Sequence, residues 1–277
     1  MVGETFWVDG VQGACVPPDD RGLGLADGVF ETMRFAAGRI GWRQLHLQRL
    51  AKGLEVLGFT DPQQTAETVL LDAARRLEAA FGAVDGTLRL TVTRGSGPRG
   101  YAIPEGGALR TILRFNPGLT EHTVPARLIV SSINWSHQPH FAGCKLLART
   151  EQVMALAQAQ DRGFQEAVMC DFNGSWLSTA SGNLFLRRGA TLITPPLECS
   201  GISGTRRRAI IDHCAQAAGY DIQIRPVNEE DERHAEEALF CNAVVGVRSI
   251  SAIDSRRFDN FEAAARLGPL VNGGSLQ

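Results

Sequence analysis

The chain has few of the features that point directly to a function. Of its 277 residues, 7% are aromatic, with only two tyrosines, and 28 basic residues nearly balance 30 acidic ones, for a formal net charge of -2. Such a balance argues against a nucleic acid or an anionic membrane bound by bulk electrostatics. No apolar run approaches the roughly 20 residues that a membrane-spanning helix needs. We therefore expect neither nucleic acid nor membrane as a partner.

Paired cysteines and metal-ligand patterns are also lacking. The first ten residues, MVGETFWVDG, contain neither the basic start nor the apolar stretch of a signal peptide. His137 and His140 flank a proline and are more typical of a loop than of a metal site. We expect no metal, a cytoplasmic location and reduced thiols. The six cysteines are scattered without a C-x-x-C pair: Cys15, Cys144, Cys170, Cys199, Cys214 and Cys241.

The periodicity of the apolar residues predicts both strands and helices. Alternation over 28–40 predicts a strand, and helical spacing over 42–57 and 61–81 predicts two helices, the second with Asp61 as its cap and Pro62 in its first turn. Further strands are expected at 87–95, 110–115, 126–132, 221–226 and 237–250, with several short ones between 166 and 194. Two more helices are expected, at 146–160 and 205–218.

Strict alternation of strand and helix is missing, which favours an α+β fold with mixed or antiparallel sheets. The length suggests about two domains. Asn116-Pro117-Gly118 breaks the chain and is followed by the polar LTEHT. We expect a small N-terminal domain at 1–116, an interdomain loop at 117–123 and a larger C-terminal domain at 124–277.

The loop G-S-G-P-R-G at 95–100 matches a dinucleotide-binding pattern. That reading needs a helix to begin at the loop, and Pro98 with the following YAIPEGG disfavours one. A flexible loop carrying Arg94, Arg99 and Tyr101 is favoured instead, because a guanidinium can hold a substrate carboxylate with two hydrogen bonds.

Two other positions allow a functional and an ordinary interpretation. The segment G-I-S-G-T-R at 201–206 precedes an amphipathic helix, so it predicts either a phosphate site at the helix start or a simple serine cap. Lys145 lies among small and apolar residues at the start of a predicted helix. Such a lysine can have a lowered pKa and an amine available for Schiff-base chemistry, although most lysines are solvated.

These segments occur together, and in order, in a known family. The chain resembles the fold-type IV (class IV) pyridoxal-phosphate enzymes, which include branched-chain aminotransferases, D-amino-acid aminotransferases and 4-amino-4-deoxychorismate lyase. The resemblance implies a two-domain fold, with a small N-terminal α/β sandwich and a larger barrel-like C-terminal domain that binds pyridoxal 5'-phosphate. The matching segments are DRGLGLADGVFETMR (20–34), HLQRL (46–50), TRGSGPRGY (93–101), KLLARTEQVMA (145–155), SGNLFLRRGATLITPPL (181–197), GISGTRR (201–207) and ALFCNAVVGVRSI (238–250).

The resemblance also implies roles for individual residues. Lys145 is similar to the lysine that binds the cofactor covalently, and Arg49 to the arginine that pairs with its phosphate. The resemblance implies substrate contacts by Arg99, Arg34 and Tyr101. The remaining implied cofactor contacts are Ser178, Asn183, Ile202, Ser203, Asn242 and Ala243. Because Cys144 and Cys241 adjoin such residues, we expect their thiols to react with thiol reagents.

Within the family the lyase branch resembles this chain best. Thr32 in FETMR lies where the lyase has a threonine implicated in catalysis, and the 95–101 loop and C-N-A at 241–243 have the lyase form. Ser178 stands where the family usually has a glutamate bonded to the pyridine nitrogen. A hydroxyl there should weaken transamination more than elimination. Leu25-Ala26 and K-L-L-A-R also depart from the lyase pattern, which bears on substrate identity.

The resemblance implies conversion of 4-amino-4-deoxychorismate to 4-aminobenzoate and pyruvate. In that reaction Lys145 would move a proton and Thr32 would act near the leaving group. The alternatives are an aminotransferase acting on a D-amino acid or a branched-chain amino acid, and a catalytically impaired homologue that binds the cofactor. The family further implies a homodimer with the active site near the subunit interface.

Overall fold

The strands and helices group into two units in the computed structural model, which describes residues 3–106, 108–119 and 122–273. Contacts place the described residues up to Leu119, together with Cys144–Ala148, in unit 1, and 122–143 with 149–273 in unit 2. The segment that carries Lys145 therefore groups with unit 1. Part of the linker expected at 117–123 lies outside the described residues.

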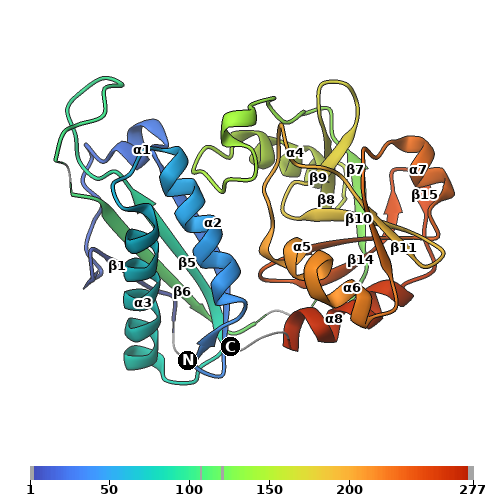
Figure 1. Cartoon of the computed structure of the whole chain (residues 1–277), viewed down its shortest axis with the longest axis horizontal. Helices are drawn as coiled ribbons and strands as arrows, with labels where there is room; N and C mark the ends of the chain where they lie inside the picture. The colour runs from blue at the N-terminus through green and yellow to red at the C-terminus, as the bar shows by residue number, and fades with distance from the viewer. Residues whose placement is uncertain (1–2, 107, 120–121, 274–277) are drawn as a thin grey trace. The chain divides into compact units, whose positions relative to one another are not determined.

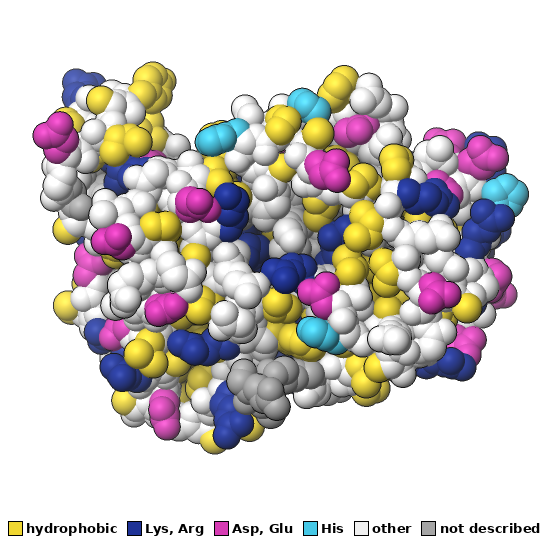
Figure 2. Space-filling model, in the orientation of Figure 1, with side chains coloured by type: hydrophobic (Ala, Val, Ile, Leu, Met, Phe, Trp, Pro, Cys, Tyr) yellow, Lys and Arg dark blue, Asp and Glu magenta, His cyan; other side chains and the backbone are white. Residues whose placement is uncertain are grey.

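Unit 1 is built on a six-stranded antiparallel sheet with the order β2-β1-β6-β5-β3-β4. Its strands are β1 (Thr5–Val8), β2 (Val11–Gln12), β3 (Gly28–Ala36), β4 (Arg39–Ile40), β5 (Gly86–Thr93) and β6 (Arg110–Pro117). The helices α2 (Arg43–Val56) and α3 (Pro62–Phe81) cover one face of this sheet, and the short α1 (Arg21–Leu25) precedes β3 (Figure 1). On the face drawn in Figure 2, basic and acidic side chains of this unit are interspersed.

The core of unit 1 explains why these segments fold as they do. Leu50 and Leu54 of α2 and Leu70 and Leu77 of α3 recur at helical spacing and are buried in one cluster with Phe35 of the sheet. The predicted helices at 42–57 and 61–81 are confirmed. Asp61 does not act as predicted, because it has a left-handed backbone (φ 45°) and its side chain makes no capping hydrogen bond.

Unit 2 contains a nine-stranded mixed sheet with the order β12-β11-β10-β13-β14-β7-β8-β9, and β15 also pairs with β14. The strand β9 ends the strand order, yet a tight turn, in which Thr179 N–H donates to Gly182 O at 2.8 Å, brings it next to β10 near the other end, so the sheet curls in a barrel-like way. Its strands are β7 (Ala126–Val130), β8 (Glu166–Cys170), β9 (Trp176–Thr179), β10 (Asn183–Arg188), β11 (Thr191–Thr194), β12 (Asp221–Ile224), β13 (Glu237–Asn242), β14 (Gly246–Ile253) and β15 (Arg256–Arg257). The predicted α+β class with antiparallel and mixed sheets is confirmed.

The helices of unit 2 differ in part from the prediction. The helix expected at 146–160 begins only at Thr150, so Lys145 precedes it and is not helical. The helix expected at 205–218 is present, with a π-helical turn in its middle. The helices α7 and α8 were not predicted, since α7 has only six residues and α8 contains Pro269. The helical segments are η1 (Pro139–Phe141), α4 (Thr150–Asp161), α5 (Thr205–Ala209), η2 (Ile210–Cys214), α6 (Ala215–Ala217), α7 (Glu229–His234) and α8 (Glu262–Gly273).

Candidate active site

Lys145 lies in an extended segment beside the start of β3. The amide of Phe30 donates to the Lys145 carbonyl at 3.0 Å, and the amide of Leu147 donates to the Gly28 carbonyl at 3.1 Å. A bridge between Val29 and Leu146 completes the pairing. The Lys145 Nζ lies 4.2 Å from the centre of the Phe30 ring, a cation–π contact. Backbone pairing with β3, rather than a helix, therefore positions this amine.

The Phe30 ring belongs to the face of β3 that the helices do not cover. Successive strand residues point to opposite faces, and Val29, Met33 and Phe35 point into the core. Phe30, Thr32 and Arg34 consequently share the other face. Thr32, which the sequence singled out, is thus on the same side of the strand as the ring beneath the lysine amine.

Arg89 joins this face, and the sequence analysis missed it. It stands directly opposite Thr32 in the β3–β5 register. Its guanidinium carbon lies 3.9 Å from the centre of the same Phe30 ring that Lys145 contacts. Two basic side chains, Lys145 and Arg89, therefore contact the Phe30 ring, and Thr32 lies on the same face of β3 two residues further along. The alternation of L-R-L-T-V at 88–92 could have placed Arg89 on the open face, but only the register put it opposite Thr32.

Arg49 belongs to α2, and its side chain contacts Glu31 on the opposite face of β3, which the helices cover. Its Nε donates to Glu31 Oε1 at 2.8 Å and its Nη2 to Glu31 Oε2 at 2.5 Å. His46, one turn earlier on α2, contacts the same carboxylate through Nδ1 at 2.6 Å. Burial by itself would raise the pKa of Glu31, but the charge and hydrogen bonds of Arg49, followed by those of His46, lower it to about 2. Glu31 is therefore ionised at neutral pH.

The 94–101 loop separates into a structural base and an exposed tip. Arg94 does not extend toward solvent, because it donates to Asp27 at 2.8 Å and to the Leu57 carbonyl at 2.5 Å. Arg21 donates to the Gly100 carbonyl at 3.2 Å and fixes the loop from the other side. Arg99 is exposed and Tyr101 is 89% exposed. Of the three side chains expected to meet a carboxylate, only Arg99 and Tyr101 are exposed to solvent. Arg94 makes internal contacts instead.

In unit 2, the turn that precedes α5 is held by Asn183 of β10. The side-chain Nδ2 of Asn183 donates to the Ile202 carbonyl at 2.9 Å. A Cβ on Gly204 would come within 1.9 Å of the Asn183 Oδ1, so only glycine fits there. Gly204, not Ser203, occupies the N-cap position, and no side chain caps the helix. The Ser203 amide donates to the Gly143 carbonyl at 3.0 Å.

Two buried arginines follow this turn in the first turn of the helix. Arg206 donates to the Ala243 carbonyl at 3.3 Å, which joins the two turns that the sequence predicted as phosphate contacts. Arg207 donates to the Thr194 hydroxyl at 3.2 Å and the Pro195 carbonyl at 2.8 Å, both neutral acceptors. Burial lowers the pKa of Arg207. Positive charge buried beside a helix start favours an anion, so this part of unit 2 suits a phosphate group.

Asn242 shapes the second of these turns. Its Oδ1 accepts from the amides of Val244 at 3.0 Å and Val245 at 2.8 Å. Its Nδ2 donates to the Ser181 carbonyl at 3.3 Å. The described contacts therefore show Asn242 organising the backbone between β13 and β14.

Ser178 on β9 is part of a neutral buried pair. The indole Nε1 of Trp135 donates to its Oγ at 2.9 Å, and both residues are buried. Because an indole N–H can only donate, the Ser178 oxygen must accept this bond, and its own hydrogen is directed elsewhere. No motif of the sequence singles out Trp135, because only the tertiary structure brings it to Ser178.

Two thiols differ from the expectation. Cys144 and Cys241 are buried, and burial raises the pKa of Cys241 to about 12. A buried thiol that remains protonated is a poor nucleophile, so the predicted reactivity of Cys241 is wrong, and the burial of Cys144 argues against the same prediction there. Across the described residues, no group of three or more His, Cys, Asp or Glu could hold a metal ion. No helix in that part of the chain is long and apolar enough to cross a membrane.

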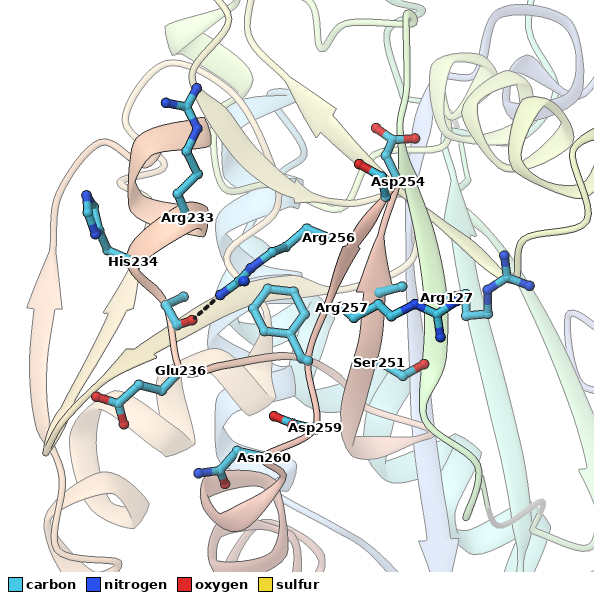
Figure 3. A pocket seen from close by; sticks show the side chains of 14 residues that line it. Arg127, Arg233, His234, Glu236, Ser251, Asp254, Arg256, Arg257, Asp259 and Asn260 are labelled. Carbon is cyan, nitrogen blue, oxygen red and sulfur yellow. Dashed lines mark hydrogen bonds between the residues drawn. The ribbon is translucent and has the colours of Figure 1, made fainter.

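A groove of about 1100 Å³ in unit 2 lies apart from these residues. Four arginines line it, from β7, α7 and β15, and Arg256 donates to the Ala235 carbonyl at 3.2 Å (Figure 3). Two of its acids pair with arginines that do not line the groove, since Glu236 contacts Arg187 and Asp254 contacts Arg162. None of the predicted site residues lines this groove, which is a mixed-charge surface.

Three comparisons with known proteins match most of the chain. The family model for class IV amino-transferases matches residues 28–253. Aminodeoxychorismate lyase of Vibrio harveyi is 31% identical over 256 residues, which cover 90% of this chain and 92% of that protein. The crystal structure of 4-amino-4-deoxychorismate lyase from Pseudomonas aeruginosa has a TM-score of 0.84 and 31% identity, covering 97% of this chain and 98% of its own. A bifunctional aminodeoxychorismate lyase / D-amino acid transaminase of Mycobacterium tuberculosis is 23% identical, covering 92% of this chain and 91% of its own.

The fold, together with these matches, defines a fold-type IV enzyme. More specifically, the chain belongs to the class IV aminotransferase family. Enzymes of this family depend on pyridoxal 5'-phosphate, so the expected class and cofactor are confirmed at the level of the family.

Proposed function

We propose that this protein is a pyridoxal-phosphate-dependent lyase that converts 4-amino-4-deoxychorismate to 4-aminobenzoate and pyruvate, a step of folate biosynthesis. The observation that carries the proposal is the open face of β3, where the Lys145 amine lies over Phe30 and Thr32 shares the same side of the strand. The 31% identity to the Vibrio harveyi lyase supports the same substrate.

Residues of this chain fit the cofactor. We propose Lys145 as the residue that attaches to it, with Arg49 and the Ile202–Ser203 backbone on its phosphate. Asn183, Asn242 and Ala243 support these contacts by fixing the two turns of unit 2. The Ser203 amide, which here donates to Gly143, would have to exchange that bond for the phosphate. The buried Arg207, bonded to neutral acceptors, is consistent with an anion nearby.

Bound pyridoxal phosphate supplies the electron delocalisation that lets the carbon–oxygen bond break. Once the substrate nitrogen takes its place on the cofactor, the freed Lys145 amine would remove the proton from the carbon that bears that nitrogen. Thr32 would donate a hydrogen bond near the departing enolpyruvyl oxygen, and that group would leave as pyruvate. Because Arg89 lies opposite Thr32, it can hold a substrate carboxylate at that point. We assign further carboxylate contacts to Arg99 and Arg34, with Tyr101 beside them.

Transamination is the second candidate, and the Mycobacterium tuberculosis relative, named for both activities, keeps it open. The Trp135–Ser178 pair favours the lyase. Transamination requires a carbanion to be stored on a ring with a protonated nitrogen. A neutral hydroxyl in place of the usual glutamate does not hold that proton. Elimination that yields an aromatic product depends less on it.

The purified protein should release pyruvate from 4-amino-4-deoxychorismate. Lys145→Ala should lose both this activity and the near-visible absorbance band of the bound cofactor. A band that survives the substitution would show that another residue attaches to the cofactor. If no pyruvate forms but an amino acid turns over with a keto acid, the protein is an aminotransferase. A normal band with neither activity would indicate an impaired homologue.

We also propose that the protein is a cytoplasmic homodimer with the active site near the subunit interface. All six cysteines are free thiols, which supports a reducing compartment. The 89% exposed Tyr101 on the 94–101 loop supports this assembly, because tyrosine rings are enriched at protein interfaces.

A further inference from the structure

We propose that Glu31 is a positioning residue which, together with His46, holds the Arg49 guanidinium in one orientation for the cofactor phosphate. The inference rests on the proposed role of Arg49. It adds two residues that neither the sequence analysis nor the proposed function uses.

The first support is the geometry of the Arg49–Glu31 pair. Two N–H groups of Arg49 meet the two oxygens of Glu31, at 2.8 and 2.5 Å, which is the two-pronged arrangement that fixes a guanidinium plane. Glu31 accepts two of the five N–H bonds that a guanidinium can make, so one group can hold Glu31 and a phosphate together. An arginine oriented beforehand loses less side-chain freedom when a ligand binds.

The second support is the contact between His46 and the same carboxylate. An ionised Glu31 can only accept hydrogen bonds, so His46 Nδ1, 2.6 Å from Oε2, must carry the hydrogen. His46 and Arg49 are three residues apart on α2, which brings both to one side of the helix. The carboxylate is therefore held from two directions and cannot turn away from Arg49.

The third support is the location of the cluster. The side chains of His46, Glu31 and Arg49 are 0%, 1% and 9% exposed. Apolar residues often stabilise such a site as well as a buried ion pair does. Stability alone thus gives little reason for three polar groups here. The need to orient a charged group toward a ligand is a direct reason for placing them here.

Cofactor binding, measured without any turnover, tests the inference. Apo-protein is titrated with pyridoxal 5'-phosphate and, separately, with pyridoxal, which lacks the phosphate, and absorbance gives the two dissociation constants. Glu31→Gln should weaken pyridoxal phosphate binding about tenfold or more, because one hydrogen bond to the charged Arg49 is lost and its plane is released. Pyridoxal binding should change less than twofold.

Two further variants separate the possible explanations. Arg49→Gln should reduce the preference for pyridoxal phosphate over pyridoxal at least as much as Glu31→Gln does. Glu237→Gln changes another fully buried carboxylate, one that caps α8 in unit 2, and should leave both constants unchanged. If Glu31→Gln unfolds the protein, Glu31→Asp keeps the charge but shortens its reach, and should show the same selective loss.

Each contrary result has a distinct meaning. Equal weakening of both ligands by Glu31→Gln would reduce Glu31 to a structural role and overturn the inference. An unchanged pyridoxal phosphate constant in Glu31→Gln, with a loss in Arg49→Gln, would also overturn it while keeping Arg49 on the phosphate. An unchanged constant in Arg49→Gln would refute the proposed role of Arg49 itself. None of these results depends on whether the protein is a lyase.

Discussion

Ser178 is the residue at which a single side chain can redirect the chemistry. Replacing it with glutamate restores the usual carboxylate of the family beside Trp135, and a carboxylate keeps a nearby ring nitrogen protonated. We expect Ser178→Glu to raise the ratio of transamination to pyruvate release about tenfold, as measured with D-alanine and a keto acid against the lyase substrate. Ser178→Ala serves as the control without a carboxylate. A ratio unchanged by glutamate would show that Ser178 does not set the reaction type.

The cysteines give a second prediction at this scale. Cys15 and Cys199 are exposed, whereas the other four are buried. Burial raises the pKa of Cys170 to about 11 and that of Cys241 to about 12, so neither forms a thiolate near neutral pH. A native titration with a chromogenic disulfide at pH 8 should show two fast thiols, and none after Cys15→Ser and Cys199→Ser. Rapid modification of Cys241 would contradict the buried placement.

At the scale of elements, the Glu31 carboxylate ties β3 to α2. Its pKa falls from 4.5 to about 2 on folding, so it contributes stability above about pH 4.5 that is lost as the pH drops toward 2. Relative to the protonated form of Glu31, this contribution is on the order of 3 kcal/mol. We expect the difference in unfolding free energy between wild type and Glu31→Gln, from urea denaturation, to shrink steadily from pH 5 to pH 2.5. A difference independent of pH would mean that Glu31 gains nothing from ionisation.

For the whole molecule, we expect self-association. Sedimentation equilibrium of the cofactor-loaded protein should give about twice the 29.9 kDa chain mass. Tyr101→Ser, at the 89% exposed position on the 94–101 loop, should weaken the dimer, because a large aromatic surface would no longer be buried between subunits. Val84→Ser, at another exposed apolar position in unit 1, is the matched control. A monomer at all accessible concentrations would contradict the proposed assembly.

The sequence by itself was enough for the long helices of unit 1, for most strands and for naming Lys145 and Thr32 as candidates. The helices at 43–56 and 62–81 carry enough periodic apolar residues that local pattern and core agree. Ordered motifs indicated the family, and with it Lys145 and the turn at Ile202. These features depend on short-range spacing, which a sequence displays directly.

Only the tertiary structure decided which residues meet. Lys145 was expected on a helix, yet its backbone pairs with β3, because strand pairing over more than one hundred residues has no local signature. Other contacts of the site also lack a local signature. They include the pairing of Arg89 with Thr32 and the hydrogen bond from Trp135 to Ser178. They also include the placement of Glu31 between His46 and Arg49. Register and burial arise from the packing of distant segments. They determined that Arg94 is a structural residue and that Cys241 is inert.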